Sequence, residues 1–398
     1  MKKKLFLSVL LSSSVLADDL SILYKDKKDL REVEKEILKQ NYKSLKNDWI
    51  SPVNINSSLN RDHSFSEESD RFTKSISLGF SQSIFESGGI EFTIKYADDK
   101  LKSDFLAWEN ENKQILQTVY EILLQIKKLE IQLEQSEYEL KNKDIELILK
   151  KIQYENGKSD ITELNNAIMA KNTQFKQNIN LKNSLKEQKL NLQKYTDLKY
   201  EQIRLIDFSS ISKEDYLKKN IELLYEDSLA QLAYTSYKKL KTDYFPKLSV
   251  STNLSYSDNE NLTSDTQEYS NSGSISLNLS MPLYDINKKS KLEKSKLEVL
   301  RQKVALSDLR NELQKEFEEI KTKIDTYKSH NQIINENIKL YIDLIEVNEV
   351  SNLAGMSSQY DLEILKNTKK INQYDLAIND INIQLEYAKL YFKIKADK

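Results

Sequence analysis

The stretch that most constrains the fold runs from Ile90 to Tyr154 and contains neither glycine nor proline. Nothing in these roughly 65 residues interrupts a helix, and at ~1.5 Å per residue the helix would be roughly 95 Å long. No single globular domain is that wide. The whole chain of 398 residues has only six glycines and three prolines. We therefore expect long continuous elements rather than the two or three compact domains that the length alone suggests.

Apolar residues in this stretch are spaced alternately four and three apart, which predicts a heptad seam and a left-handed supercoil. The seam comprises Ile115, Val119, Ile122, Ile126, Leu129, Leu133 and Leu140. A second stripe comprises Leu116, Leu123, Leu124 and Ile131. The helix should therefore contact partners on two sides. Gly157 is the natural turn into a returning helix that starts near Ser159 and reaches about Tyr200.

Two later segments alternate apolar residues with serine or asparagine, which predicts strands with one apolar and one hydroxyl-rich face. They lie near 246–257 and 273–284, joined by a polar loop at 258–270. A weaker pair is expected near 50–60 and 71–85, with a loop at 60–70. Strands of about ten residues can cross a bilayer, and small polar groups suit a water-filled lumen. From these residues alone, a solvent-exposed hairpin of a soluble protein fits equally well.

Residues 1–17 have three lysines, a short apolar run and small residues ending at Ala17, which predicts a secretory signal peptide. Its removal would change the net charge from −2 to about −5, so we expect no nucleic-acid partner. The chain has no cysteine and therefore no disulfide or cysteine metal site. No other stretch approaches a transmembrane helix, which leaves only strands for membrane insertion.

Several short motifs occur twice, about 194 to 199 residues apart. Leu45-Lys46-Asn47-Asp48-Trp49 corresponds to Leu240-Lys241-Thr242-Asp243-Tyr244, and Gly157 with Ser159 corresponds to Gly355 with Ser357. The order is helix, strand pair, long helix, turn and return helix. We therefore predict two tandem repeats, 18–205 with its turn near 157 and 206–398 with its turn near 355.

The paired motifs resemble those of TolC-type outer membrane efflux proteins over nearly the whole mature chain. They are Ile84-Phe85-Glu86-Ser87-Gly88-Gly89, Met281-Pro282-Leu283-Tyr284-Asp285, the Phe245-Pro246 strand entry and the two Gly-x-Ser turns. The resemblance implies a mixed α and β fold and a homotrimer. Each subunit would give four strands to a 12-stranded transmembrane β-barrel in the outer membrane. Its long helices would form a coiled-coil α-helical barrel in the periplasm.

Elementary physics also requires several copies, because four strands cannot close and an open edge in lipid leaves backbone groups unpaired. Three copies leave room for a channel, although four also remain open on physical grounds. The predicted function is an exit duct for small molecules or proteins in a tripartite efflux or type I secretion system. The alternative is a secreted structural coiled coil or adhesin without a pore, which would leave the serine-faced strands without a reason.

The resemblance assigns the closed end of the duct to the helical turns. It places aperture carboxylates at Glu163 and Asp361, and contact with a periplasmic adaptor near Gly157, Ser159, Gly355 and Ser357. An inner-membrane pump would complete the system. Six crowded carboxylates in a trimer should favour cations. The family's tyrosine and arginine gate partners are not met, because Asn352 and Ser357 stand at those places.

Ordinary structural roles compete with these assignments: Glu163 and Asp361 could be solvated helix carboxylates, and the two glycines simple helix caps. His63 and His330 are isolated, without the spacing of metal ligands. No nucleophilic triad, phosphate-binding glycine loop or paired-carboxylate signature occurs. We therefore expect no enzyme activity, no metal and no cofactor.

Overall fold

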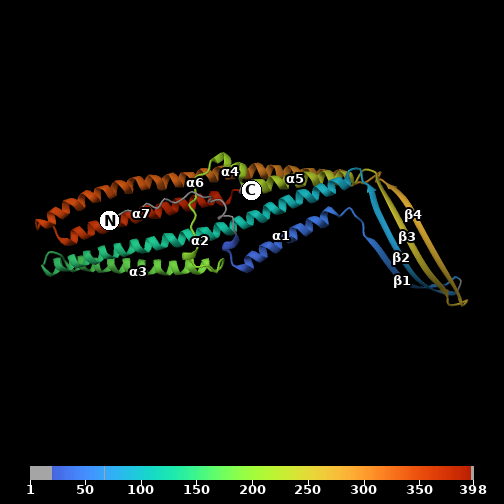
Figure 1. Ribbon diagram of the computed structural model, residues 1–398, viewed down its shortest axis with the longest axis horizontal. Helices are drawn as coiled ribbons and strands as arrows, with labels where there is room; N and C mark the ends of the chain where they lie inside the picture. Colours follow the sequence, from blue (N-terminus) through green and yellow to red (C-terminus); the bar gives the residue numbers. More distant parts are fainter. Residues whose placement is uncertain (1–19, 67, 396–398) are drawn as a thin grey trace. The chain divides into compact units, whose positions relative to one another are not determined.

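The computed structural model describes residues 20–66 and 68–395, so the expected signal peptide at 1–17 lies outside the described residues. Figure 1 shows long helices and a sheet. The sheet has four strands. The elements in chain order are η1 (Leu20–Ile22), α1 (Lys25–Lys46), β1 (Val53–Ser64), β2 (Ser69–Phe85), α2 (Gly89–Glu155), α3 (Ile161–Leu192), η2 (Tyr200–Gln202), α4 (Lys213–Lys219), α5 (Ile221–Thr242), β3 (Lys247–Asn261), β4 (Thr266–Ser280), α6 (Lys288–Leu353) and α7 (Gln359–Phe392).

The expected long helices are present. α2 has 67 residues without interruption, and α6 has 66. Each is followed by a turn and a shorter helix, α3 or α7, so an order of helix, two strands, long helix and shorter helix occurs twice along the chain. The division into repeats at residue 205 remains a prediction from the sequence motifs.

The four strands form one antiparallel sheet in the order β1-β2-β3-β4. The pairing of β2 with β3 joins the two predicted hairpins within one chain, with Leu78 opposite Leu254 and Ser77 opposite Ser255. A bulge between Ser83 and Phe85 shifts the register near the end of this ladder. The outer edges of β1 and β4 have no strand partner among the described residues.

The strands are longer than the sequence pattern predicts, and the expected loops at 60–70 and 258–270 are wrong. β1 and β2 continue to Ser64 and Ser69, while β3 and β4 continue to Asn261 and Thr266. Ladder hydrogen bonds need only backbone groups, so polar side chains can continue a strand after the apolar alternation ends. β4 ends at Ser280 rather than near 284, because Pro282 cannot donate to a ladder.

The described residues divide into two compact units. One contains the described residues up to 32 together with 109–223 and 309–395, and the other contains 33–108 and 224–308. α2 and α6 therefore contribute residues to both. The core of the first unit includes Val119 and Leu123 of α2, both fully buried. Aromatic rings extend this core, with the Tyr120 ring 5.9 Å from that of Phe208 and 5.5 Å from that of Phe392.

The second unit holds the sheet and the helix segments next to it in the chain. Polar contacts attach two shorter helices to the start of α2. The Tyr42 hydroxyl of α1 donates to Asp98 at 2.9 Å, and the Thr235 hydroxyl of α5 donates to Asp99 at 2.6 Å. These bonds fix the helical segments from which the strands leave.

Candidate functional site

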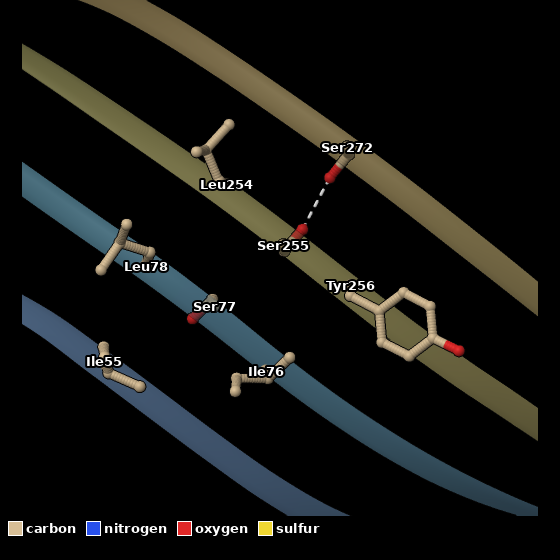
Figure 2. Close-up of a pocket in the computed structure, with 8 residues that line it drawn as sticks. All are labelled: Ile55, Ile76, Ser77, Leu78, Leu254, Ser255, Tyr256 and Ser272. Carbon is tan, nitrogen blue, oxygen red and sulfur yellow. Dashed lines mark hydrogen bonds between the residues drawn. The ribbon is translucent and has the colours of Figure 1, made fainter.

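The sheet separates apolar from hydroxyl side chains across all four strands. In the observed register, Ile55, Leu78 and Leu254 lie in one row on one face. Asn56, Ser77 and Ser255 form the neighbouring row on the opposite face. Figure 2 shows apolar side chains of β1, β2 and β3 beside one another. The register therefore gives one continuous apolar face and one continuous polar face.

The apolar face is exposed to an unusual degree. Ile55 is 72% exposed, Leu254 59% and Ile275 83%. Ile76, Leu78 and Tyr256 help to line a shallow depression of about 450 Å³ on the sheet (Figure 2). An apolar face of this extent marks a surface that binds protein or lipid.

The polar face is held together by side-chain hydrogen bonds between neighbouring strands. The Ser58 and Ser75 hydroxyls are 2.8 Å apart, and the Ser255 and Ser272 hydroxyls are 2.6 Å apart (Figure 2). The Asn278 amide donates to the Ser251 hydroxyl at 2.7 Å. These small uncharged groups can exchange partners with water, so the face suits a hydrated lumen.

On the apolar face, charged residues replace apolar ones near the turns that join β1 to β2 and β3 to β4. Lys74, in the row beyond Ile76, lies 3.6 Å from Asp258. Arg61 and His63 both contact the Asp70 carboxylate, at 3.1 and 2.8 Å. Apolar side chains therefore occupy the middle of the face, and ionic groups occupy its end.

The turn between α2 and α3 depends on a glycine and a charge pair. Gly157 has φ +69°, and nothing lies within 4 Å of the position that a Cβ would take. Asp160 caps α3 by accepting from the Glu163 backbone N–H at 2.8 Å. The Glu163 carboxylate accepts from the Ser159 hydroxyl and from Lys150 Nζ at 3.0 Å. Both contacts, the hydroxyl first, lower the pKa of Glu163.

The turn between α6 and α7 has neutral hydrogen bonds in addition to an ion pair between its helices, from Lys366 Nζ to Glu349 at 2.7 Å. Gly355 has φ +71°, and its Cβ position is equally open. The Ser357 hydroxyl donates to the Asn348 side chain at 3.1 Å, and the Asn352 amide donates to the Ser357 carbonyl at 3.0 Å. Asp361 forms a capping box with Ser358, whose hydroxyl donates to the Asp361 carboxylate at 2.7 Å.

The two aperture candidates therefore occupy equivalent places with different surroundings. Glu163 and Asp361 both lie in the first turn of a return helix, and both are exposed. Glu163 is paired with a cation, whereas among the described residues Asp361 bonds only with the Ser358 cap. Sequence reasoning missed Lys150, although its place five residues before the end of α2 could have indicated it. Asn352 and Ser357, noted for lacking the expected gate side chains, bond to each other.

Among residues 20–66 and 68–395, no cluster of three or more histidine, cysteine or acidic side chains could hold a metal ion. Within the same residues, no helix combines the length and hydropathy needed to span a membrane.

Solved structures place this fold among outer membrane channels. The outer membrane protein VceC from Vibrio cholerae matches with a TM-score of 0.74 and 11% identity, covering 95% of this chain and 93% of VceC. The CmeC outer membrane channel of Campylobacter jejuni matches with a TM-score of 0.70 and 14% identity, covering 95% of this chain and 84% of CmeC. The Neisseria gonorrhoeae MtrE channel in its open state matches with a TM-score of 0.67 and 12% identity, covering 94% and 88%.

The fold is therefore that of outer membrane channel subunits. The sequence profile of the outer membrane efflux protein family matches residues 27–197, so the resemblance predicted from the sequence is confirmed. That family is one of efflux ducts rather than of enzymes. No curated protein matches the sequence significantly.

Proposed function

We propose that the protein is the subunit of an outer membrane exit duct for solutes. The observation that carries this proposal is the sheet, which is apolar on one face, hydroxyl-rich on the other and, within the residues that the structure describes, unpaired at both edges. The apolar face would contact lipid and the serine face would line the pore. A secreted coiled coil or adhesin would need none of these features.

The unpaired edges support assembly from several copies. β1 has 12 residues and β4 has 15, and their outer backbone groups would be unsatisfied in a membrane. Pairing β4 of one copy with β1 of the next satisfies both edges. Three copies give twelve strands and a barrel wide enough for a channel, and the family resemblance favours this number.

The helical hairpins would continue the duct into the periplasm, with their turns at the end away from the outer membrane. Exposed apolar residues at one turn, Leu353 at 90% and Met356 at 84%, offer a surface for a periplasmic adaptor. The adaptor would link the duct to an inner-membrane pump. Photo-crosslinking from Lys158 and Met356 in cells should capture the same adaptor. Capture of an unrelated soluble protein from both positions would contradict this part of the proposal.

Lys150 would also influence the aperture, because it pairs with Glu163. Three copies of Glu163 and Asp361 bring six carboxylates to the closed end, but each Glu163 is paired with a lysine. Removing Lys150 should therefore raise cation selectivity, while replacing Glu163 and Asp361 together should abolish it.

Planar bilayers test the function and the aperture together. The purified mature protein should form a detergent-extracted trimer that dissociates on heating and conducts ions. Reversal potentials under a salt gradient should rank Lys150→Gln above the wild type in cation selectivity, and E163Q/D361N below it. Pores with unchanged selectivity in both variants would refute the assignment of Glu163 and Asp361 to the aperture. A monomeric protein recovered in detergent-free buffer, without the spectroscopic signal of β-strands, would refute the proposal of a duct.

A further inference from the structure

The connection between β4 and α6 exposes a group of large apolar side chains. Leu283 is 92% exposed, Tyr284 83% and Ile286 76%. They come shortly after Leu277 and Leu279 of β4, which are 67% and 73% exposed on the apolar face of the sheet. The apolar surface of the sheet is therefore continuous along the chain with this connection.

The helix that follows begins with five exposed lysines within nine residues. They are Lys288, Lys289, Lys291, Lys294 and Lys296. The first turn of α6 contains no acidic residue. Positive side chains at a helix N-terminus oppose the helix dipole, so this arrangement is unfavourable for the helix itself. Lysines that destabilise their own helix in this way indicate a function other than stabilising it.

The corresponding helix of the first half begins differently. An acidic residue, Glu86 or Asp285, precedes the helix in both connections, but Glu91 lies in the first turn of α2, whereas the first turn of α6 has no acidic residue. The first lysine of α2 is Lys95. The basic cluster therefore belongs to one of two equivalent places and is not a general feature of the fold.

Local contacts hold the connection but leave several ammonium groups available. Asp285 accepts from the Asn287 backbone N–H at 2.8 Å and from Lys291 Nζ at 3.2 Å. Lys288 lies over the Tyr244 ring at 5.0 Å. In the part of the chain that the structure describes, no carboxylate lies within ion-pair distance of three lysines, Lys289, Lys294 and Lys296.

We propose that residues 281–296 form an interfacial anchor that binds headgroups of anionic phospholipids. The exposed apolar side chains would enter the headgroup boundary, and the lysines would reach the phosphates from the aqueous side. The leaflet is the one at which the helices join the sheet. This inference rests on the proposed function, because it requires the apolar face to lie in a membrane.

A neighbouring copy fits this surface less well than lipid does. In the proposed ring, the edge of β4 meets β1 of the next copy, and α1 of that copy ends with Lys43 and Lys46. Two basic surfaces repel each other, whereas an anionic membrane surface complements both. Charge therefore favours lipid as the occupant.

The test uses the full-length protein, purified in a non-ionic detergent and stripped of lipid. Thermal unfolding is followed while dioctanoyl phosphatidylglycerol, dioctanoyl phosphatidylcholine or inorganic phosphate is added. The anionic lipid should raise the midpoint of the wild type, and the other two should not. Each lysine near an anionic surface contributes about fivefold in binding. K289Q/K294Q/K296Q should therefore need roughly a hundredfold more anionic lipid for the same shift.

A matched control removes three exposed lysines from the same helix, far along the chain from the sheet. K315Q/K321Q/K323Q should respond to lipid as the wild type does. An undiminished response of K289Q/K294Q/K296Q, or an equal response to phosphatidylcholine or phosphate, would overturn the anchor. Dissociation of that variant into monomers in lipid-free detergent would overturn it too, by assigning the surface to an interface between copies. A variant that conducts ions but lacks the lipid preference refutes the anchor alone, whereas a wild type without pores refutes the proposed function.

Discussion

Introducing arginine on either face of β2 tests the orientation of the sheet in the membrane. Leu78 is 42% exposed on the apolar face, and Lys74 and Gln82 lie four positions to either side of it on that face. Four residues span about 13 Å along a strand, or about 10 Å along the membrane normal at a tilt near 40°. The apolar band of an outer membrane barrel is about 25 Å tall, so Leu78 lies close to its middle.

The expected cost of Leu78→Arg follows from this depth. Arginine at the midplane of a lipid-facing barrel surface costs about 2–4 kcal/mol per copy. At 1.4 kcal/mol per factor of ten, this corresponds to roughly 30-fold or more in the folding equilibrium of each copy. Ser77→Arg, one residue away, places the same side chain in the hydrated lumen and should change folding by less than about threefold.

The assay is assembly of the full chain into phosphatidylcholine vesicles. Trimers are scored by their mobility in unheated gels, with protease protection as a second measure. Leu78→Arg should leave only a few per cent of the wild-type trimer, while Ser77→Arg should assemble normally. Equal yields for the two variants, or the greater loss for Ser77→Arg, would refute the assignment of the faces.

Three further predictions concern the helical hairpins. Leu123→Ala empties a fully buried site and should lower the free energy of unfolding by about 2–5 kcal/mol in urea titrations, whereas Leu300→Ala at a 55% exposed site should stay within about 0.5 kcal/mol. Burial raises the pKa of Glu139, so its negative charge lowers the stability of the folded state as pH rises through the folded pKa. Glu139→Gln should therefore raise the thermal midpoint at pH 7.5 but not at pH 4. An equal gain at both pH values would contradict this reasoning. Gly157→Ala should lower the free energy of unfolding by about 1 kcal/mol, because alanine is strained at a positive φ while nothing lies close enough to clash with its Cβ. A loss above about 3 kcal/mol would contradict this, since it would require a steric clash at that position.

Much of the fold could be predicted because its long elements carry strong periodic signals. The absence of glycine and proline from 90 to 154 predicts one helix, and α2 occupies Gly89–Glu155. Val119 and Ile126 of the predicted seam are fully buried, as is Leu123 of the second stripe. Alternation of serine with apolar residues predicts the two faces of the sheet, because a strand has a period of two.

The features that the sequence does not predict depend on contacts between residues far apart in the chain. The pairing of β2 with β3 is a backbone interaction between residues about 180 positions apart, and no local pattern specifies it. The same is true of strand ends such as Ser64, where backbone bonding continues through a polar sequence. At the turns, the carboxylate positions could be predicted, but the pairing of Lys150 with Glu163 depends on how two helices lie side by side.

Exposed ion pairs near both helical turns make ionic strength an influence on each hairpin of the proposed duct. The bridge from Lys150 to Glu163 is exposed, and concentrated salt screens such pairs within a few ångströms. The amide and hydroxyl contacts of Asn348, Asn352 and Ser357 carry no net charge and persist. Salt also screens the exposed pair of Lys366 with Glu349 between α6 and α7, so a change from dilute to saline surroundings would loosen the ionic contacts of both hairpins and leave the neutral bonds of the second turn in place.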